Sequence, residues 1–270
     1  EQFAKLQKEL PGEVFTTRTL ATYSYELNNK KAPFDNVNVR KALNLSLDRN
    51  VITDKVLGQG QTPTYVFTPT YIEEGQLIQQ PAYSKEPMAQ RNEEAIKLLE
   101  EAGYSKANPL KFSILYNTNE NHKKVAIAAA SMWKANTKGL IDVKLENQEW
   151  KTYIDSRRAG RYDAARAGWN ADYNQATTFG NYFLSNSSNN TAKYANPEYD
   201  KAIAESYVAT DAEGRAKAYA KAEEILAKDF GIVPIFNYVN PRLVKPYVKG
   251  YSGKDPQDHI YLRNLYIIKH

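Results

Sequence analysis

The sequence has 270 residues, 42% hydrophobic and 25% charged, which is enough for one large or two modest domains with buried cores. Its 36 Lys and Arg residues are offset by 31 Asp and Glu residues and form no basic block, so no nucleic-acid partner is predicted. The absence of cysteine excludes disulfides and Cys-ligated zinc, and no apolar run reaches the roughly 20 residues that a membrane helix needs.

The first part of the chain predicts helices, one long strand and a packed loop. In its opening residues, EQFAKLQKEL, the apolar side chains recur at helical spacing, as they would in the middle of a domain. We therefore predict that the chain is a fragment or a processed piece. The aromatic residues of segment 58–81 favour a packed coil over disorder. In chain order, the predicted elements are a helix over 1–10, a strand over 14–27, a helix from Asp35 or Asn36 to 47, a helix over 48–56 and a helix over 92–102.

The second part alternates strands with helices. The predicted elements are strands over 109–116, 141–145, 162–169 and 231–239, and helices over 119–136, 150–158, 179–184, 197–208 and 211–228, followed by short strand-like pieces after 241. The strand–helix–strand–helix–strand order up to residue 169 predicts an α/β sheet with crossovers. Pro234 inside its strand predicts an edge strand or a bulge.

The stretch ARAGWNADYN, residues 164–173, carries the most chemistry. Small or apolar residues surround Arg166, Trp169 and Asp172. This pattern suggests a strand that runs out of a buried core and places its polar side chains in a cleft. Alternation places Arg166 on the same face as Ala164 and Gly168, and Gly168 would let another backbone come close. The alternative is a strand end with an Arg and an Asp on the surface.

Catalytic and metal-binding motifs are missing. The sequence has no G-x-G-x-x-G, P-loop, H-E-x-x-H or G-x-S-x-G, and its histidines, at 122, 259 and 270, are far apart, so neither a metal nor a cofactor is expected. Asp163 and Asp172 could in principle form the carboxylate pair of a glycosidase, but no other residue supports that interpretation.

Several long strings resemble the C-terminal half of the periplasmic oligopeptide-binding proteins, the receptors that deliver peptides to an ABC importer. They are QEWKTYIDSR (148–157), ARAGWNADYN (164–173), SNNTAKY (188–194), KAEEILAKD (221–229), VPIFNYVNPRLVKPYV (233–248), YSGKDP (251–256) and the final LYIIKH. The resemblance implies an α/β fold of the venus-flytrap, type II-like kind. By analogy, residues 1–20 are the edge of a first lobe, 21–238 form the second lobe, and 239–270 return to the first.

The resemblance also implies a location, partners and site residues. It implies the periplasm of a Gram-negative cell, short oligopeptides as ligands, the membrane subunits of an ABC importer, and a missing N-terminal half of the same protein. Asp172 would bind the peptide's α-ammonium. Three residues would meet peptide C-terminal carboxylates at different lengths, namely Arg166, His122 and Arg157. Trp150, Trp169 and Tyr238 would line side-chain pockets, with Gly168 and Asn170 beside them.

Two alternatives remain open. Leu57 stands where the resemblance leads us to expect a carboxylate-binding lysine, which keeps a receptor for a murein tripeptide under consideration. A peptide-processing enzyme would use Asp172 or Asp163 as a general base, but the sequence offers it neither a clear nucleophile nor a metal site, so we expect no enzyme.

Overall fold

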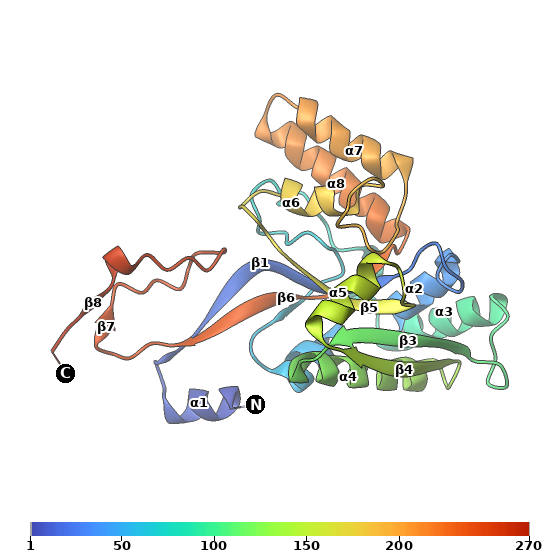
Figure 1. Ribbon diagram of the computed structural model, residues 1–270, viewed down its shortest axis with the longest axis horizontal. Coiled ribbons are helices and arrows are strands. Elements are labelled where there is room, and N and C mark those ends of the chain that lie inside the picture. The colour runs from blue at the N-terminus through green and yellow to red at the C-terminus, as the bar shows by residue number, and fades with distance from the viewer. Residues whose placement is uncertain (1, 270) are drawn as a thin grey trace.

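The computed structural model describes residues 2–269, and a six-stranded mixed sheet forms its centre (Figure 1). The strands are β1 (Val14–Leu27), β2 (Thr62–Pro63), β3 (Leu110–Asn117), β4 (Ile141–Gln148), β5 (Ala164–Asn170) and β6 (Ile232–Leu243), in the spatial order β2-β6-β1-β5-β3-β4. β3 runs parallel to β4 and β5, whereas β1 is antiparallel to β5 and β6. The predicted α/β sheet with crossovers is confirmed.

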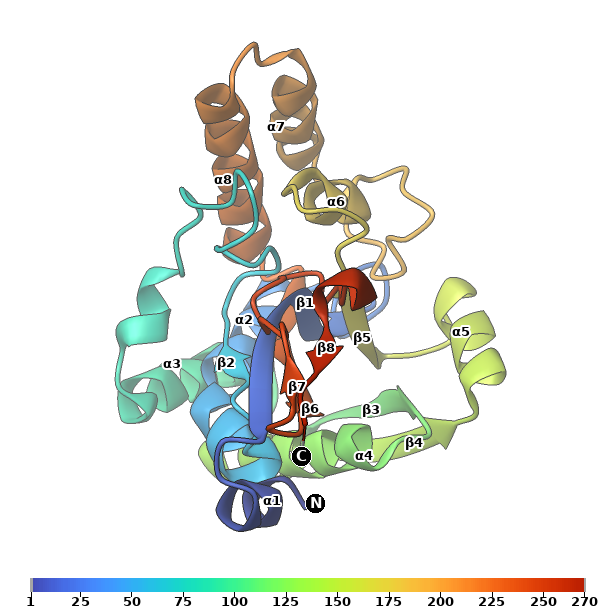
Figure 2. The ribbon, with the colours of Figure 1, turned by 90° about the vertical axis from the view of Figure 1, so that its left-hand side faces the viewer.

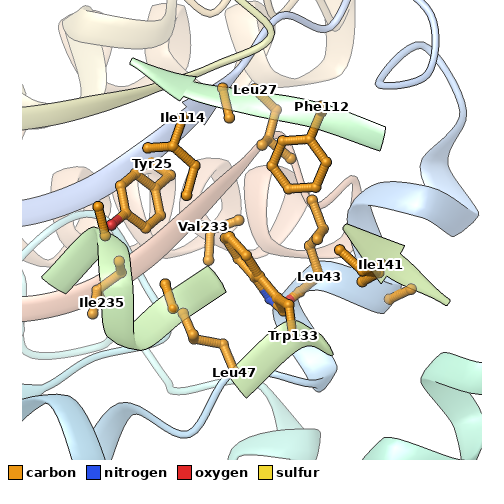
Figure 3. Packing of buried hydrophobic residues seen from close by; sticks show 14 of the residues in the cluster. Tyr25, Leu27, Leu43, Leu47, Phe112, Ile114, Trp133, Ile141, Val233 and Ile235 are labelled. Atoms are coloured by element: carbon orange, nitrogen blue, oxygen red, sulfur yellow. The ribbon is translucent and has the colours of Figure 1, made fainter. Parts of the chain in front are cut away.

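One face of the sheet is covered by α2 (Val37–Leu45), α3 (Met88–Glu101) and α4 (Glu120–Asn136). The buried residues of α4 recur every three or four positions, which gives the helix one apolar stripe toward the sheet. Trp133, the last of them, packs against Phe112 and Tyr25 and donates its indole N–H to the Leu43 carbonyl at 2.9 Å (Figure 3). The main core therefore lies between these helices and the strands.

The opposite face is covered by α5 (Trp150–Arg158) and by a second helical group. That group consists of α6 (Thr177–Gly180), η3 (Asn181–Phe183), α7 (Pro197–Val208) and α8 (Ala212–Lys228), and α7 and α8 project from it side by side (Figure 2). Alternation along β3 sends Ile114 into the main core and Leu115 toward Tyr153 of α5. The central strands are thus buried on both faces, as crossover connections require, whereas the edge strand β4 exposes Asp142, Lys144 and Asn147.

Side-chain caps start several helices close to where the sequence predicts them. Asn36 accepts a hydrogen bond from the Asn38 N–H, Asn119 from two N–H groups at the start of α4, and Asp211 from the Gly214 N–H at 2.7 Å. α3 differs from the prediction, because it begins four residues earlier, at Met88 directly after Pro87. The remaining short elements are the π-helical η1 (Val51–Leu57) and the 3₁₀ turn η2 (Ala82–Lys85).

Pro234 sits at a bulge and not in an edge strand. β6 lies between β1 and β2, and its register against β1 shifts where Ser24 faces Pro234 directly after Tyr23 faces Phe236. The two-residue β2 pairs only with Asn237 and Phe236, so Pro234, which has no N–H, lies outside that pairing. The predicted bulge is confirmed, and the alternative of an edge strand is wrong.

The two ends of the chain extend away from the sheet and its covering helices, along β1 and β6 (Figure 1). They carry α1 (Phe3–Glu9), β7 (Val248–Lys249), η4 (Leu262–Asn264) and β8 (Tyr266–Ile267). Large apolar side chains of this tail remain exposed within residues 2–269, among them Leu243, Leu262 and Ile267. His270 lies outside the described residues. None of the helices in this range is long and apolar enough to cross a membrane.

Candidate functional site

An open cavity of about 690 Å³ lies where β1, β5 and β6 meet the tail. Its lining comes from these strands, from the residues around α4 and α5 and from the tail, and consists of Thr19, Leu20, Ala21, Asn117, His122, Trp150, Arg166, Gly168, Asn170, Ala171, Tyr238, Asn240, Pro256, Gln257 and Asp258. Six of the nine predicted site residues are in this list. The other three, Arg157, Trp169 and Asp172, do not line it.

Arg166 brings a half-buried positive charge to the cavity wall. One guanidinium nitrogen, Nη2, donates to the Tyr238 hydroxyl at 2.6 Å, and the other, Nη1, lies 3.5 Å from the Asn117 amide oxygen. The guanidinium carbon lies 5.2 Å from the centre of the Tyr23 ring. Burial acts to lower the pKa of Arg166, but the phenol groups of Tyr238 and Tyr23 outweigh it and the pKa is raised, so the side chain stays charged.

No carboxylate neutralises this charge within residues 2–269. Arg166 forms no ion pair there, and its Nε is buried without a hydrogen-bond partner. A half-buried cation without a counter-ion keeps an unbalanced positive charge, which attracts an anion. The wall therefore presents an anion-binding group to the cavity.

Gly168 gives Arg166 and Tyr238 the room they occupy. A β-carbon at this position would lie 3.0 Å from both the Arg166 Nη2 and the Tyr238 hydroxyl. The sequence led us to expect a second backbone beside Gly168, but two side chains approach it instead. The predicted common face of Ala164, Arg166 and Gly168 is consistent with β5, since Ala164 lies in the main core that borders the cavity.

His122 lines the cavity in its neutral form. Burial, with a further contribution from the Arg166 charge, lowers its pKa to about 3, and its Nδ1 is buried without a partner. The resemblance implies that His122 meets a carboxylate. Around neutral pH it can do so only as a hydrogen-bond donor from a neutral ring, without a positive charge.

This shift predicts an acid-sensitive stability. In the unfolded chain His122 takes up a proton near its ordinary pKa of 6.5, whereas in the folded chain it resists protonation down to about pH 3. The unfolded state therefore binds more protons across this window, so stability should fall as the pH is lowered from about 6.5 toward 3. We expect the fall to be smaller in the His122→Gln variant. Urea midpoints at pH 7 and pH 4 measure it, with His259→Gln, an exposed histidine, as the control.

Arg157 is placed differently from its predicted role. Its Nη2 lies 2.9 Å from the Glu26 carboxylate and also donates to the Tyr182 and Thr191 hydroxyls. Burial acts to lower the pKa of Arg157, but the Glu26 charge outweighs it and raises the pKa well above its ordinary value. In this chain Arg157 is a buried structural cation that is already paired, and the cavity does not reach it. The structure therefore does not support a direct contact with a peptide carboxylate.

Trp169 also points away from the cavity. Arg166, Gly168 and Asn170 line it, so the alternation of β5 turns the odd-numbered Trp169 to the opposite face. There its ring packs edge-on against Tyr182 at 5.0 Å, and its N–H donates to the Thr178 hydroxyl at 3.2 Å. Trp150, by contrast, is 58% exposed and lines the cavity. The predicted pocket role of Trp169 is thus not supported by this cavity.

Asp172 lies two residues past the end of β5, beside the cavity residues Asn170 and Ala171. Its side chain is exposed and forms no ion pair within residues 2–269, while its backbone carbonyl lies 3.4 Å from the Gln257 amide of the tail. Asp163 lies before the start of β5 and is engaged with Lys31 at 2.7 Å and with Ser113. β5 alone is roughly 20 Å long, so the two carboxylates cannot form a glycosidase pair.

The sequence reasoning missed the part of the wall made by β1 and the tail. Between Arg18, which faces Val239, and Thr22, which faces Asn237, three β1 residues stand opposite Tyr238 alone. The Leu20 N–H in this bulge donates to the Pro256 carbonyl at 2.8 Å, which fixes the tail at the cavity edge. No local motif marks these positions, because the bulge depends on how two distant strands pair.

An open cavity with convergent polar groups is suited to hold a small solute. Residues 1–191 match the profile of the bacterial extracellular solute-binding proteins, family 5 (middle), so the chain belongs to this family. It is 96% identical over 270 residues to the periplasmic oligopeptide-binding protein OppA of Haemophilus influenzae, covering 100% of this chain and 50% of that protein. It is 44% identical over 268 residues to the periplasmic murein peptide-binding protein MppA of Escherichia coli, covering 99% of this chain and 49% of that protein.

A solved crystal structure of one of these relatives has the same fold as this chain. The crystal structure of Haemophilus influenzae OppA in complex with RPPGFSPFR superposes with a TM-score of 0.93 at 95% identity, covering 99% of this chain and 52% of that one. The chain spans about half the length of the curated relatives it matches. The family and the fold that the resemblance implied are confirmed. The predicted periplasmic location agrees with the names of these relatives, which are periplasmic proteins.

Proposed function

We propose that the protein containing this chain is a periplasmic receptor that binds short oligopeptides by their charged termini and backbone and delivers them to the membrane subunits of an ABC importer. The observation that carries the proposal is Arg166, a half-buried cation without a carboxylate partner in the described residues, on the wall of an open cavity. A peptide C-terminal carboxylate would supply the missing charge. Asp172, two residues past the end of the same strand, would take the α-ammonium.

The rest of the wall suits a ligand whose sequence varies. A peptide held by its own backbone, like an added strand, needs no particular side chain. The cavity volume leaves room for water around the ligand's side chains, and water can adapt its hydrogen bonds to each of them. We infer that such a receptor selects peptide length more strongly than peptide sequence.

Lobe closure completes the proposal. We propose that residues 21–238 form one lobe and that residues 1–20 and 239–270 belong to the other, whose remainder lies in the half that the relatives have in addition. The exposed apolar residues of the tail are explained if that remainder packs on them. Closure would then remove Asp172 from solvent and strengthen its attraction for an ammonium group.

The ligand itself tests the class of function. Mass spectrometry of what co-purifies with the full-length protein should find short peptides of mixed sequence. A single peptide containing diaminopimelate would favour the murein alternative. Turnover of added peptides would favour an enzyme, for which Asp163 is poorly placed because Lys31 and Ser113 already hold it.

A length series tests the role of Arg166. We expect Arg166→Ala to weaken the binding of one peptide length by at least about tenfold, or ~1.4 kcal/mol, and of the neighbouring lengths by less. The reason is that only one length places its carboxylate at this cation. Calorimetry with dipeptides to pentapeptides measures the effect, and Arg158→Ala, which removes the exposed arginine at the end of α5, is the control. A uniform loss at all lengths would mean that Arg166 sets only the general electrostatic field.

A further inference from the structure

A second, smaller cavity of about 210 Å³ opens beside the first. The two share His122 and Tyr238, so a ligand that passes Arg166 and Tyr238 reaches the second cavity next. At ~30 Å³ for each water, this volume corresponds to about seven water molecules. The space is therefore suited to one amino-acid residue with some water, and not to a second folded ligand.

The polar wall of the second cavity consists of amides. Gln59, Gln61, Asn119 and Asn121 line it, and no Asp, Glu, Lys or Arg does. Gln59 and Gln61 are fixed to each other, since the Gln61 side-chain NH₂ donates to the Gln59 amide oxygen at 3.1 Å. Asn119 uses its oxygen to cap α4, so its NH₂ group is left to face a ligand or water. Such a wall offers hydrogen bonds without a net charge.

The apolar wall is rigid and aromatic. Tyr23 and Phe236 stack with ring centres 4.7 Å apart, and Leu57 and Val125 complete this side. His122 separates the two cavities as a neutral ring whose Nδ1 has no partner in the described residues. The main cavity thus receives a positive charge from Arg166, whereas no residue that lines the second cavity carries one.

We propose that the second cavity is a subsite for an uncharged residue of a peptide that extends past Arg166, and that it rejects a carboxylate at that position. This inference rests on the proposed function and adds a chemical preference to it. A neutral side chain exchanges its hydrogen bonds with water for those of the amide wall and packs on the stacked rings. A carboxylate would lose water and gain no counter-charge, and the aromatic faces would add repulsion.

A charge scan of one peptide tests the proposal. The probe is the nonapeptide RPPGFSPFR, and each interior residue is replaced in turn by Gln and by Glu, which differ by a charge and hardly in size. Calorimetry with the full-length protein should find one position at which Glu binds at least about tenfold more weakly than Gln. Leu57→Lys places a cation in the subsite and should abolish or reverse the preference at that position alone.

Val51→Lys is the matched control. Val51 begins the same short helix, η1, that Leu57 ends, and it is exposed and lines neither cavity, so the variant adds the same charge outside the subsite. It should leave the Gln–Glu difference unchanged. If the peptides bind but no position responds specifically to Leu57→Lys, the subsite is refuted while the proposed function stands. If no peptide of the series binds, both are refuted.

Discussion

Replacing Glu26 with alanine is expected to destabilise the protein by about 3–5 kcal/mol, because it leaves Arg157 as a buried charge without a counter-ion. The Glu26 side chain is 1% exposed and accepts hydrogen bonds from the Tyr182 hydroxyl at 2.6 Å and from the Thr191 hydroxyl, in addition to its ion pair with Arg157. These partners come from α5, η3 and the loop that follows. Glu26 in β1 therefore ties the second helical group to the sheet.

Urea denaturation followed by tryptophan fluorescence measures this loss. Glu213→Ala removes the exposed partner of Lys217 in α8 and should cost no more than about 0.5 kcal/mol. The double variant Glu26→Leu with Arg157→Leu should recover most of the loss, since a buried pair can often be replaced by apolar residues of similar volume. Equal effects of Glu26→Ala and Glu213→Ala would contradict the assignment of Arg157 to a buried ion pair.

Replacing Asp172 with asparagine is expected to weaken the binding of peptides with a free N-terminus by about 2–5 kcal/mol in the full-length protein. The substitution keeps the shape of the side chain and removes the charge that would face the ammonium group inside the closed cleft. Asp172 has no ion-pair partner within residues 2–269, so its charge is available to a ligand. In the open state its exposure to water should reduce the attraction to about 0–1 kcal/mol.

Acetylated peptides provide the complementary measurement. They should bind weakly to the native protein and lose little further affinity in Asp172→Asn, because the ammonium group is already gone. Asp142→Asn, at an exposed position of β4, is the control for a general change of charge. Equal affinity of the native protein for free and acetylated peptides would remove Asp172 from the binding site.

Local patterns in the sequence were sufficient for most of the elements. The strand predicted over 14–27 and the helices predicted over 150–158 and 197–208 match β1, α5 and α7 residue for residue. Their periodicity and their capping residues lie within a few positions of each element, so short-range physics determines them. The common face of Arg166, Gly168 and Asn170 is local in the same sense, since the period of a strand orders it.

Only the tertiary structure decided what those residues meet. Arg157 is paired with a carboxylate that is 131 positions away in the chain, Glu26, and Trp169 faces a helical layer that begins after its own strand. The low pKa of His122 arises from burial and from Arg166, neither of which can be read from the neighbours of His122 in the sequence. The cavity and its charge come from pairing between distant strands and from the tail that crosses beside them. Burial and charge compensation are properties of the assembled fold, whereas the spacing of apolar residues and the positions of capping residues are fixed by the amino-acid order itself.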